Sequence, residues 1–240
     1  PSDRYGLSLD SKFRRMNSFG RLYRIHIFGE SHGESVGMVI DGVPAGIPLD
    51  PGDFENDFSR RRSGAKGTTP RKEPDVPRII SGLFEGHTTG APITFLFGNT
   101  SARSRDYSKL KETPRPGHAD FTASQKFGGY QDYRGGGHFS GRLTLGLVAA
   151  GVIARKITDP VTVHASLIEA GGSKEIHAAV DKAVEEKDSI GGIVECRIEG
   201  VPVGLGEPFF DSVESLLSHL IFSIPAIKGI EFGSGFGAAR

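Results

Sequence analysis

The feature that most constrains the fold is the stretch from Thr113 to Ile157, where a glycine triplet leads into an apolar segment. The triplet, Gly135 to Gly137, has no Cβ atoms, so its backbone can adopt positive φ angles and approach another group closely. Ser140 is a suitable N-cap for a helix that begins near Gly141. Apolar residues then recur with helical spacing from Leu143 to Val152. The sequence therefore predicts a glycine-rich turn followed by a core helix.

The beginning of that helix is also a candidate anion site. Free N–H groups and the positive end of the helix dipole favour an anion at such a position, and Arg134, His138 and Arg142 surround it in the sequence. A flexible glycine loop before a core helix remains the alternative, because the triplet alone is a weak signal.

Composition narrows the class of protein. The chain has 240 residues with 37% hydrophobic and 24% charged residues, which is typical of a soluble globular protein. Its 29 basic residues balance 29 acidic ones, so no overall basic field favours nucleic acid. No apolar run reaches the length of a membrane span, and we expect no membrane partner. Cys196 is the only cysteine, which excludes an internal disulfide and a cysteine-rich metal site and favours a reducing, cytoplasmic location.

The N-terminal residues 1–15 differ from the rest of the chain. They are polar and show no sustained periodicity or secretory signal pattern. Met16 is a candidate native start, with residues 1–15 as an N-terminal extension or an expression remnant. We expect residues 16–240 to form a single α+β domain.

The first predicted elements surround a histidine. Residues 22–28 and 36–43 have the composition of strands, and the turn Gly29 to Gly33 between them can display His32. His32 is either a functional side chain or an ordinary turn residue. A helix is predicted from Pro51 to about Arg62, because Asp50 can cap it and proline suits its first position.

The remaining elements complete an α+β pattern. Further strands are expected at residues 78–84, 92–98, 161–169, 192–198 and 227–232, and helices at 174–186 and after the capping-box sequence 211–214. Strand pairs joined by short turns, with helices between the pairs, predict antiparallel sheets. Cys196 is interpreted as a small core residue.

A cluster of cations follows the first helix. Six basic residues and no acidic residue occur between Arg60 and Lys72. Such a run is either a solvated face or a loop that closes over a multiply charged anion. We expect it to become ordered when the anion binds.

No familiar motif for a serine hydrolase, a P-loop, a zinc site or a carboxylate pair occurs in the sequence. What remains is arginines, which hold anions through paired hydrogen bonds, and histidines carried on turns, which can transfer protons near neutral pH. These residues suit a phosphorylated and carboxylated small molecule, but they do not name the reaction.

Several segments together resemble one known family. The sequence GESHG from Gly29 to Gly33, followed by DGVPAGIP from Asp41, is similar to the N-terminal signature of the chorismate synthases. Further matches follow in the family's order: DFSRRR from Asp57, RKEPD from Arg71, FEGHTTG from Phe84, RPGHAD from Arg115, DYRGGG from Asp132 and AIKGIEF from Ala226. The resemblance covers residues 16–240.

The resemblance implies a fold and a reaction. It implies a β-α-β sandwich with antiparallel sheets, and a carbon–oxygen lyase of the shikimate pathway, which supplies aromatic amino acid biosynthesis. The substrate would be 5-enolpyruvylshikimate 3-phosphate, which loses phosphate and a ring proton in an anti-1,4-elimination that gives chorismate. Reduced FMN would be required without net redox change, with NADPH as the candidate reductant. A homotetramer is the implied assembly, with neither nucleic acid nor a metal involved.

The resemblance also implies residue roles. His32 would be a general acid that faces the leaving phosphate, and His118 would lie beside the flavin. The substrate-binding residues would be Ser31, Arg61, Arg115 and Arg142, and the cofactor-binding residues Arg61, Lys66, His138, Phe139 and Ser140. His138 and Phe139 depart from the Arg-Ser that many family members have at these positions.

The resemblance implies that family members continue for roughly half of this length beyond Arg240, so we expect the C-terminal third of their fold to be missing from these residues. We expect these 240 residues alone to bind FMN weakly and to form an incomplete active site. The alternative to a lyase is accordingly a truncated, non-catalytic fragment that binds an anion or flavin.

Overall fold

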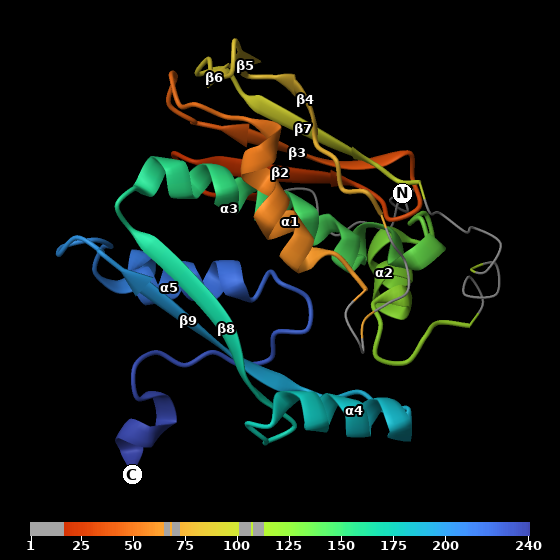
Figure 1. Cartoon of the computed structure of the whole chain (residues 1–240). Coiled ribbons are helices and arrows are strands. Elements are labelled where there is room, and N and C mark those ends of the chain that lie inside the picture. The colour runs from red at the N-terminus through yellow and green to blue at the C-terminus, as the bar shows by residue number, and fades with distance from the viewer. Residues whose placement is uncertain (1–16, 65–67, 69–72, 101–106, 108–112) are drawn as a thin grey trace, which may run out of the picture. The chain divides into compact units, whose positions relative to one another are not determined.

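The computed structural model describes residues 17–64, 68, 73–100, 107 and 113–240, and the expected N-terminal extension, 1–15, lies outside them. The chain divides into two compact units, Pro1–Ile157 and Thr158–Arg240. Both contain antiparallel strands and helices (Figure 1), so the predicted α+β class is confirmed. The single domain expected over 16–240 stays a prediction.

The first unit is built on a five-stranded antiparallel sheet. Its strands lie in the order β1 (Ser18–Phe19), β2 (Arg24–Gly29), β3 (Ser35–Asp41), β7 (Ile93–Gly98) and β4 (Arg78–Ser81). Alternate residues of the central strands are buried, among them Met38 and Ile40 on β3 and their neighbours on β7. Because side chains alternate along a strand, this pattern defines one core-facing side of the sheet.

Two helices cover that face. The 3₁₀ turn Pro51–Phe54 leads into α1 (Glu55–Arg61), and the predicted cap is confirmed, because the Asp50 side chain accepts a hydrogen bond from the Gly52 N–H. Phe54 and Phe58 pack on the β7 phenylalanines Phe95 and Phe97, with ring centroids 5.4 and 5.7 Å apart.

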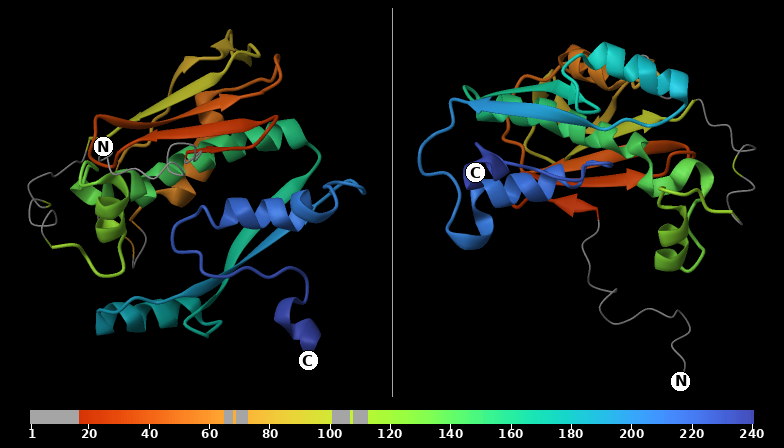
Figure 2. Two further views of the ribbon diagram at one scale, coloured as in Figure 1. Left: turned by 180° about the vertical axis from the view of Figure 1, so that it is seen from behind. Right: turned by 90° about the horizontal axis from the view of Figure 1, so that it is seen from below.

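The second covering helix, α3 (Thr144–Thr158), lies over β2 and β3 (Figure 2). A Cβ atom at Gly146 would be 3.4 Å from Ile27 and 3.5 Å from Met38, so the helix approaches the sheet closely there. Ser140 caps the 3₁₀ turn Gly141–Leu143 that precedes α3, as predicted, by accepting a hydrogen bond from the Arg142 N–H.

The ends of these elements meet at one end of the sheet. Strand β2 ends at Gly29, and Ser35 at the start of β3 pairs with Gly98 at the end of β7. The loop after β2 is tied to the glycine triplet, because the Ser31 N–H donates to the Gly137 carbonyl at 3.0 Å. The end of α1 and the beginning of α3 lie beside this loop. Residues far apart in the sequence are therefore brought together here.

Smaller elements complete the first unit. A short hairpin is formed by β5 (Leu83–Phe84) and β6 (His87–Thr88). Helix α2 (Asp120–Phe127), which ends at Gly128 in the left-handed conformation, was not expected from the sequence. The 3₁₀ segment Arg134–Phe139 contains the glycine triplet.

The second unit is a two-stranded antiparallel sheet of β8 (Thr162–Ala170) and β9 (Gly192–Glu199), with α4 (Ile176–Glu186) between them in sequence and α5 (Val213–Ile221) after them. Two 3₁₀ turns are present, Phe209–Asp211 and Gly235–Ala239.

Three expectations for this unit were wrong. The cap of α5 is Ser212, one residue beyond the predicted position, because its hydroxyl accepts from the Ser215 N–H. Residues 227–232 are described and form no strand. Cys196 is exposed, because it lies on a sheet of only two strands.

Among the described residues, none of the helices combines the length and the apolar character that crossing a membrane requires.

Candidate active site

A cleft of about 410 Å³ lies at the end of the sheet where α1 ends and α3 begins. It is lined by residues of the loop after β2, the end of α1, the segment before β4, and the glycine-rich turn. Six of the predicted site residues line it, namely Ser31, His32, Arg61, Arg115, Ser140 and Arg142.

His32 is buried in the wall of the cleft, with 6% of its surface exposed. Its Nδ1 atom lies 3.2 Å from the Ser31 hydroxyl. The ring of Tyr107 contacts the imidazole edge-on, with centroids 4.7 Å apart. A histidine held in this way has few alternative orientations, which suits proton transfer to a bound ligand.

The glycine triplet explains how two histidines come close to one backbone segment. Gly135 and Gly136 have φ angles of 58° and 83°, which other residues rarely adopt. A Cβ atom at Gly135 would lie 2.3 Å from Cε1 of His32, and one at Gly136 would lie 2.5 Å from Cε1 of His118. The groups that the bare backbone approaches are therefore the two imidazoles.

His118 belongs to a charged cluster beside the cleft. Its Nδ1 atom is 2.8 Å from Oδ1 of Asp120, and Arg115 donates from Nε and Nη2 to the two oxygens of the same carboxylate. Hydrogen bonding from Arg115 lowers the pKa of Asp120 to about 2. Since the carboxylate is then ionised at neutral pH, it can accept a hydrogen bond from Nδ1 of His118, while Nε2 of His118 lies 3.3 Å from Nη2 of Arg115.

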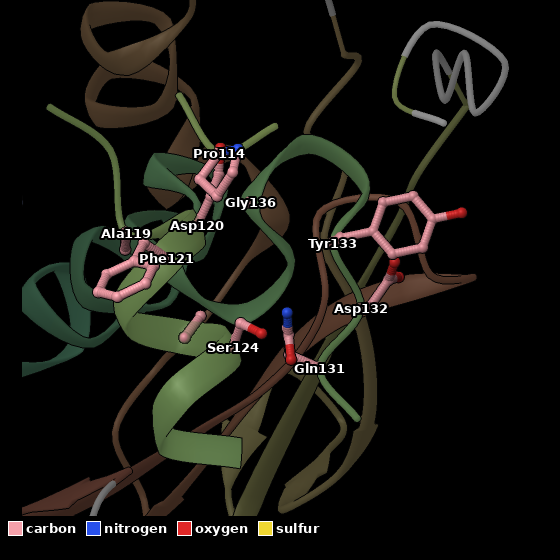
Figure 3. Close-up of a pocket in the computed structure, with 10 residues that line it drawn as sticks. Pro114, Ala119, Asp120, Phe121, Ser124, Gln131, Asp132, Tyr133 and Gly136 are labelled. Atoms are coloured by element: carbon pink, nitrogen blue, oxygen red, sulfur yellow. The ribbon is translucent and has the colours of Figure 1, made fainter. Parts of the chain in front are cut away.

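A second, smaller cavity of about 60 Å³ adjoins this cluster. Asp120 and Gly136 form part of its wall, and the Ser124 side chain points toward the Gln131 amide across it (Figure 3). Helix α2 therefore places Asp120 both in the charged cluster and in the wall of this cavity.

Arg61 and Arg142 share one buried carboxylate. Asp75, 3% exposed, accepts from Nη1 of Arg61 at 3.1 Å and, through its other oxygen, from Nη1 of Arg142. Burial lowers the pKa of Arg61, and the nearby charge of Arg142 lowers it further. The Arg61 guanidinium nevertheless stays charged at neutral pH.

Arg62, the residue that follows Arg61 at the end of α1, is also paired with a carboxylate. Arg62 donates to both oxygens of Glu55, at 2.8 and 3.2 Å, and to the Pro74 carbonyl. The sequence showed only a run of cations, because Glu55 precedes that run and Asp75 follows it. Lys66, predicted to bind the cofactor, lies outside the described residues, as do most residues of the basic run beyond Gly64.

The remaining predicted cofactor residues are placed differently from one another. Ser140 lines the cleft, whereas His138 and Phe139 are not part of its lining. Both ring nitrogens of His138 have partners within the protein, the Gly29 carbonyl at 2.8 Å and Oδ1 of Asn17 at 2.9 Å. His138 is thus held within the protein, and its expected role at a flavin stays a prediction. No group of three or more potential metal-ligating side chains occurs among the described residues.

Comparisons with known proteins find relatives along most of the chain. A family model for chorismate synthase matches residues 23–240. The chorismate synthase of Chitinophaga pinensis is 66% identical over 226 residues, which are 94% of this chain and 68% of that protein. The chorismate synthase of Dehalococcoides mccartyi strain BAV1 is 47% identical, over 93% of this chain and 70% of its own length.

The fold is also found among solved structures. A crystal structure of a chorismate synthase superimposes with a TM-score of 0.69 at 24% identity, covering 92% of this chain and 70% of the other. This likeness shows the fold. The family model over residues 23–240 and the high identity of the relatives show that the chain belongs to the chorismate synthase family.

Proposed function

We propose that this protein is a chorismate synthase, a lyase that converts 5-enolpyruvylshikimate 3-phosphate into chorismate and phosphate. In the reaction the C–O bond to phosphate and one ring C–H bond break, so phosphate and a proton leave. The observation that carries the proposal is that His32, Arg61, Arg115 and Arg142, from separate parts of the sequence, line one cleft in a chain of this family.

His32 is proposed as the general acid for the departing phosphate. A phosphate leaves more readily when a proton is delivered to it as the C–O bond breaks. The buried imidazole of His32 lies in the cleft wall next to the Ser31 hydroxyl, and both groups can donate to a phosphate oxygen. Ser31 accordingly helps to bind the substrate.

Arg115 and Arg61 are proposed to bind the carboxylates and the phosphate of the substrate. Each uses only part of its five N–H donors within the protein. The Asp120 carboxylate orients Arg115 and His118 together, so an anion bound by Arg115 lies next to the His118 imidazole. That imidazole can then hold or move a proton through Nε2.

The residues fit reduced FMN, which the family requires. The cleft volume is in the range of small-molecule sites. Arg61 and the Ser140 hydroxyl, which both line the cleft, are donors that suit a phosphate. When bound, reduced FMN supplies electron density for the elimination without being consumed. Exclusion of water by the closed site would strengthen every charge contact of these residues.

Three further expectations are part of this proposal: a homotetramer, a cytoplasmic location and NADPH as the reductant of the flavin. The alternative of a non-catalytic binding fragment has no specific observation in its favour.

The test is an anaerobic assay of the protein at its full natural length, with 5-enolpyruvylshikimate 3-phosphate and reduced FMN. Chorismate, measured by its absorbance, and phosphate should form in equal molar amounts. With oxidised FMN and no reductant, neither product should form. Binding of the phosphorylated substrate with no chorismate formed under reducing conditions would contradict the proposal.

A further inference from the structure

A carboxylate is an unexpected group in the wall of a cleft that binds anions. Asp75 lines the cleft beside Arg61 and Arg142, and its side chain is only 2% exposed. A negative charge there opposes a substrate with two carboxylates and a phosphate, since buried charges are poorly screened. A carboxylate at this position must therefore have a role that outweighs its repulsion of the substrate.

The contacts of Arg142 indicate that role. Besides its bond to Asp75, Arg142 donates from Nε to Oδ1 of Asn99 at 3.1 Å and from Nη2 to the Gly98 carbonyl at 3.2 Å. Every nitrogen of this guanidinium is thus fixed, and the arginine is anchored to the end of β7.

Arg61 is held just as firmly from the other side. Its Nε atom donates to the Thr144 hydroxyl at 3.3 Å, and Nη2 donates to the carbonyls of Gly141 and Arg142 at 3.2 and 3.3 Å. Since Asp75 accepts from both guanidiniums, it joins the end of α1 to the turn that opens α3.

The backbone of Asp75 is strained as well. Its φ angle is 52°, a conformation that is uncommon for residues other than glycine. Such a conformation persists only where the surrounding contacts determine it. The two guanidiniums are contacts of this kind.

From these contacts we propose that Asp75 is a positioning residue, which fixes the guanidiniums of Arg61 and Arg142 so that their remaining N–H groups face one substrate. The inference rests on the proposed function, because it assigns the ligand as the substrate of that reaction. Asp75 itself does not touch the substrate. The repulsion between the Asp75 carboxylate and the substrate is outweighed, because both guanidiniums then contact one multiply charged anion.

The test compares Asp75→Asn with Glu73→Gln in the protein at its full natural length. Glu73 also lines the cleft, but its carboxylate accepts from the N–H and hydroxyl of Thr100. Both substitutions remove one negative charge, so charge alone predicts that both variants bind anions more tightly. If Asp75 positions the arginines, titration calorimetry should show affinity for 5-enolpyruvylshikimate 3-phosphate reduced about tenfold or more in Asp75→Asn only.

Inorganic phosphate separates positioning from general damage. It needs only one cation, so Asp75→Asn should bind it at least as tightly as the unsubstituted protein does. If Asp75→Asn weakened the binding of phosphate and of substrate equally, Asp75 would have only a structural role, and the inference would be overturned. Substrate affinity unchanged in Asp75→Asn would overturn it too, while leaving the proposed function intact.

A second variant covers the case in which Asp75→Asn does not fold. Asp75→Glu keeps the charge and the ion pairs but moves the oxygens by one methylene group, so it should fold and still raise KM for the substrate. Full substrate affinity in Asp75→Glu would overturn the inference. An unsubstituted protein that fails to bind the substrate at all would overturn the proposed function and this inference with it.

Discussion

At the scale of single residues, the main feature is that the cations of the cleft are paired with acids. Arg61 and Arg142 share Asp75, Arg115 holds Asp120, and Arg62 holds Glu55. These pairs reduce the net charge of the cleft and fix the direction of each guanidinium. Binding of an anion then depends on geometry as well as on charge.

His32 should be essential for turnover. Replacing either His32 or His118 with alanine should lower kcat by roughly 10²–10⁴-fold with a modest loss of substrate affinity, because a proton-transfer group is removed. His26→Ala is the matched control, because His26 contacts Ser18 on strand β1 and does not line the cleft. Near-normal turnover of both the His32 and the His118 variants would contradict the assigned roles.

Asp120 should contribute pH-dependent stability. Its folded pKa of about 2 lies below the ordinary value of 3.8, so its ionised form stabilises the folded state by about 2 kcal/mol above pH 5. That contribution is lost as the pH falls through the range from about 4 to 2, and roughly half remains at pH 3. Asp120→Asn should therefore be less stable than the unsubstituted protein at pH 7, with a difference that narrows toward pH 3 in denaturant titrations. A difference that stays constant from pH 7 to pH 3 would show that ionisation of Asp120 is not the cause.

At the scale of elements, the site depends on how three short segments end or begin. The loop after β2 carries His32, α1 ends with Arg61, and the 3₁₀ segment Arg134–Phe139 carries the glycine triplet. These boundaries were predictable from local signals, namely the Asp50 cap, the Ser140 cap and the glycines. Local signals identify where a segment turns, but they do not identify what it contacts.

The glycine turn can be tested against two other glycines. Gly135→Ala should lower kcat at least tenfold, because its Cβ would displace the His32 ring. Gly117→Ala introduces a side chain at a similar φ of 72° with no atom within 4 Å, and Gly191→Ala introduces one in open space, outside the cleft lining and without a positive φ. Gly117→Ala should therefore lose some stability but keep its turnover, and Gly191→Ala should change neither. Equal losses of activity in Gly135→Ala and Gly117→Ala would point to backbone strain instead of contact with His32.

Several features could not be predicted because they depend on distant partners. Asp75 was visible only as part of a sequence match, and its bonds to Arg61 and Arg142 span 14 and 67 residues. Helix α2 was missed because its eight residues have little amphipathic pattern, although Gly128 marks its end. The strand expected at 227–232 has a suitable composition, but no described strand pairs with it.

At the scale of the whole molecule, the sequence motifs and the fold lead to the same family. The matched segments extend along the chain, and the comparison with solved structures covers 92% of it. The chain spans about 68% to 70% of the length of the curated relatives described above. The cleft is formed entirely by residues of the first unit, so the chemistry proposed here is assigned to that unit.

The most direct test of the account is a crystal structure of the protein at its full natural length with 5-enolpyruvylshikimate 3-phosphate bound. If His32 is the general acid, the phosphate should lie within hydrogen-bond distance of His32, and Arg115 should contact the same ligand. The bonds from Asp75 to Arg61 and Arg142 should be kept. A substrate bound away from the cleft, with His32 and Arg115 untouched, would contradict the account.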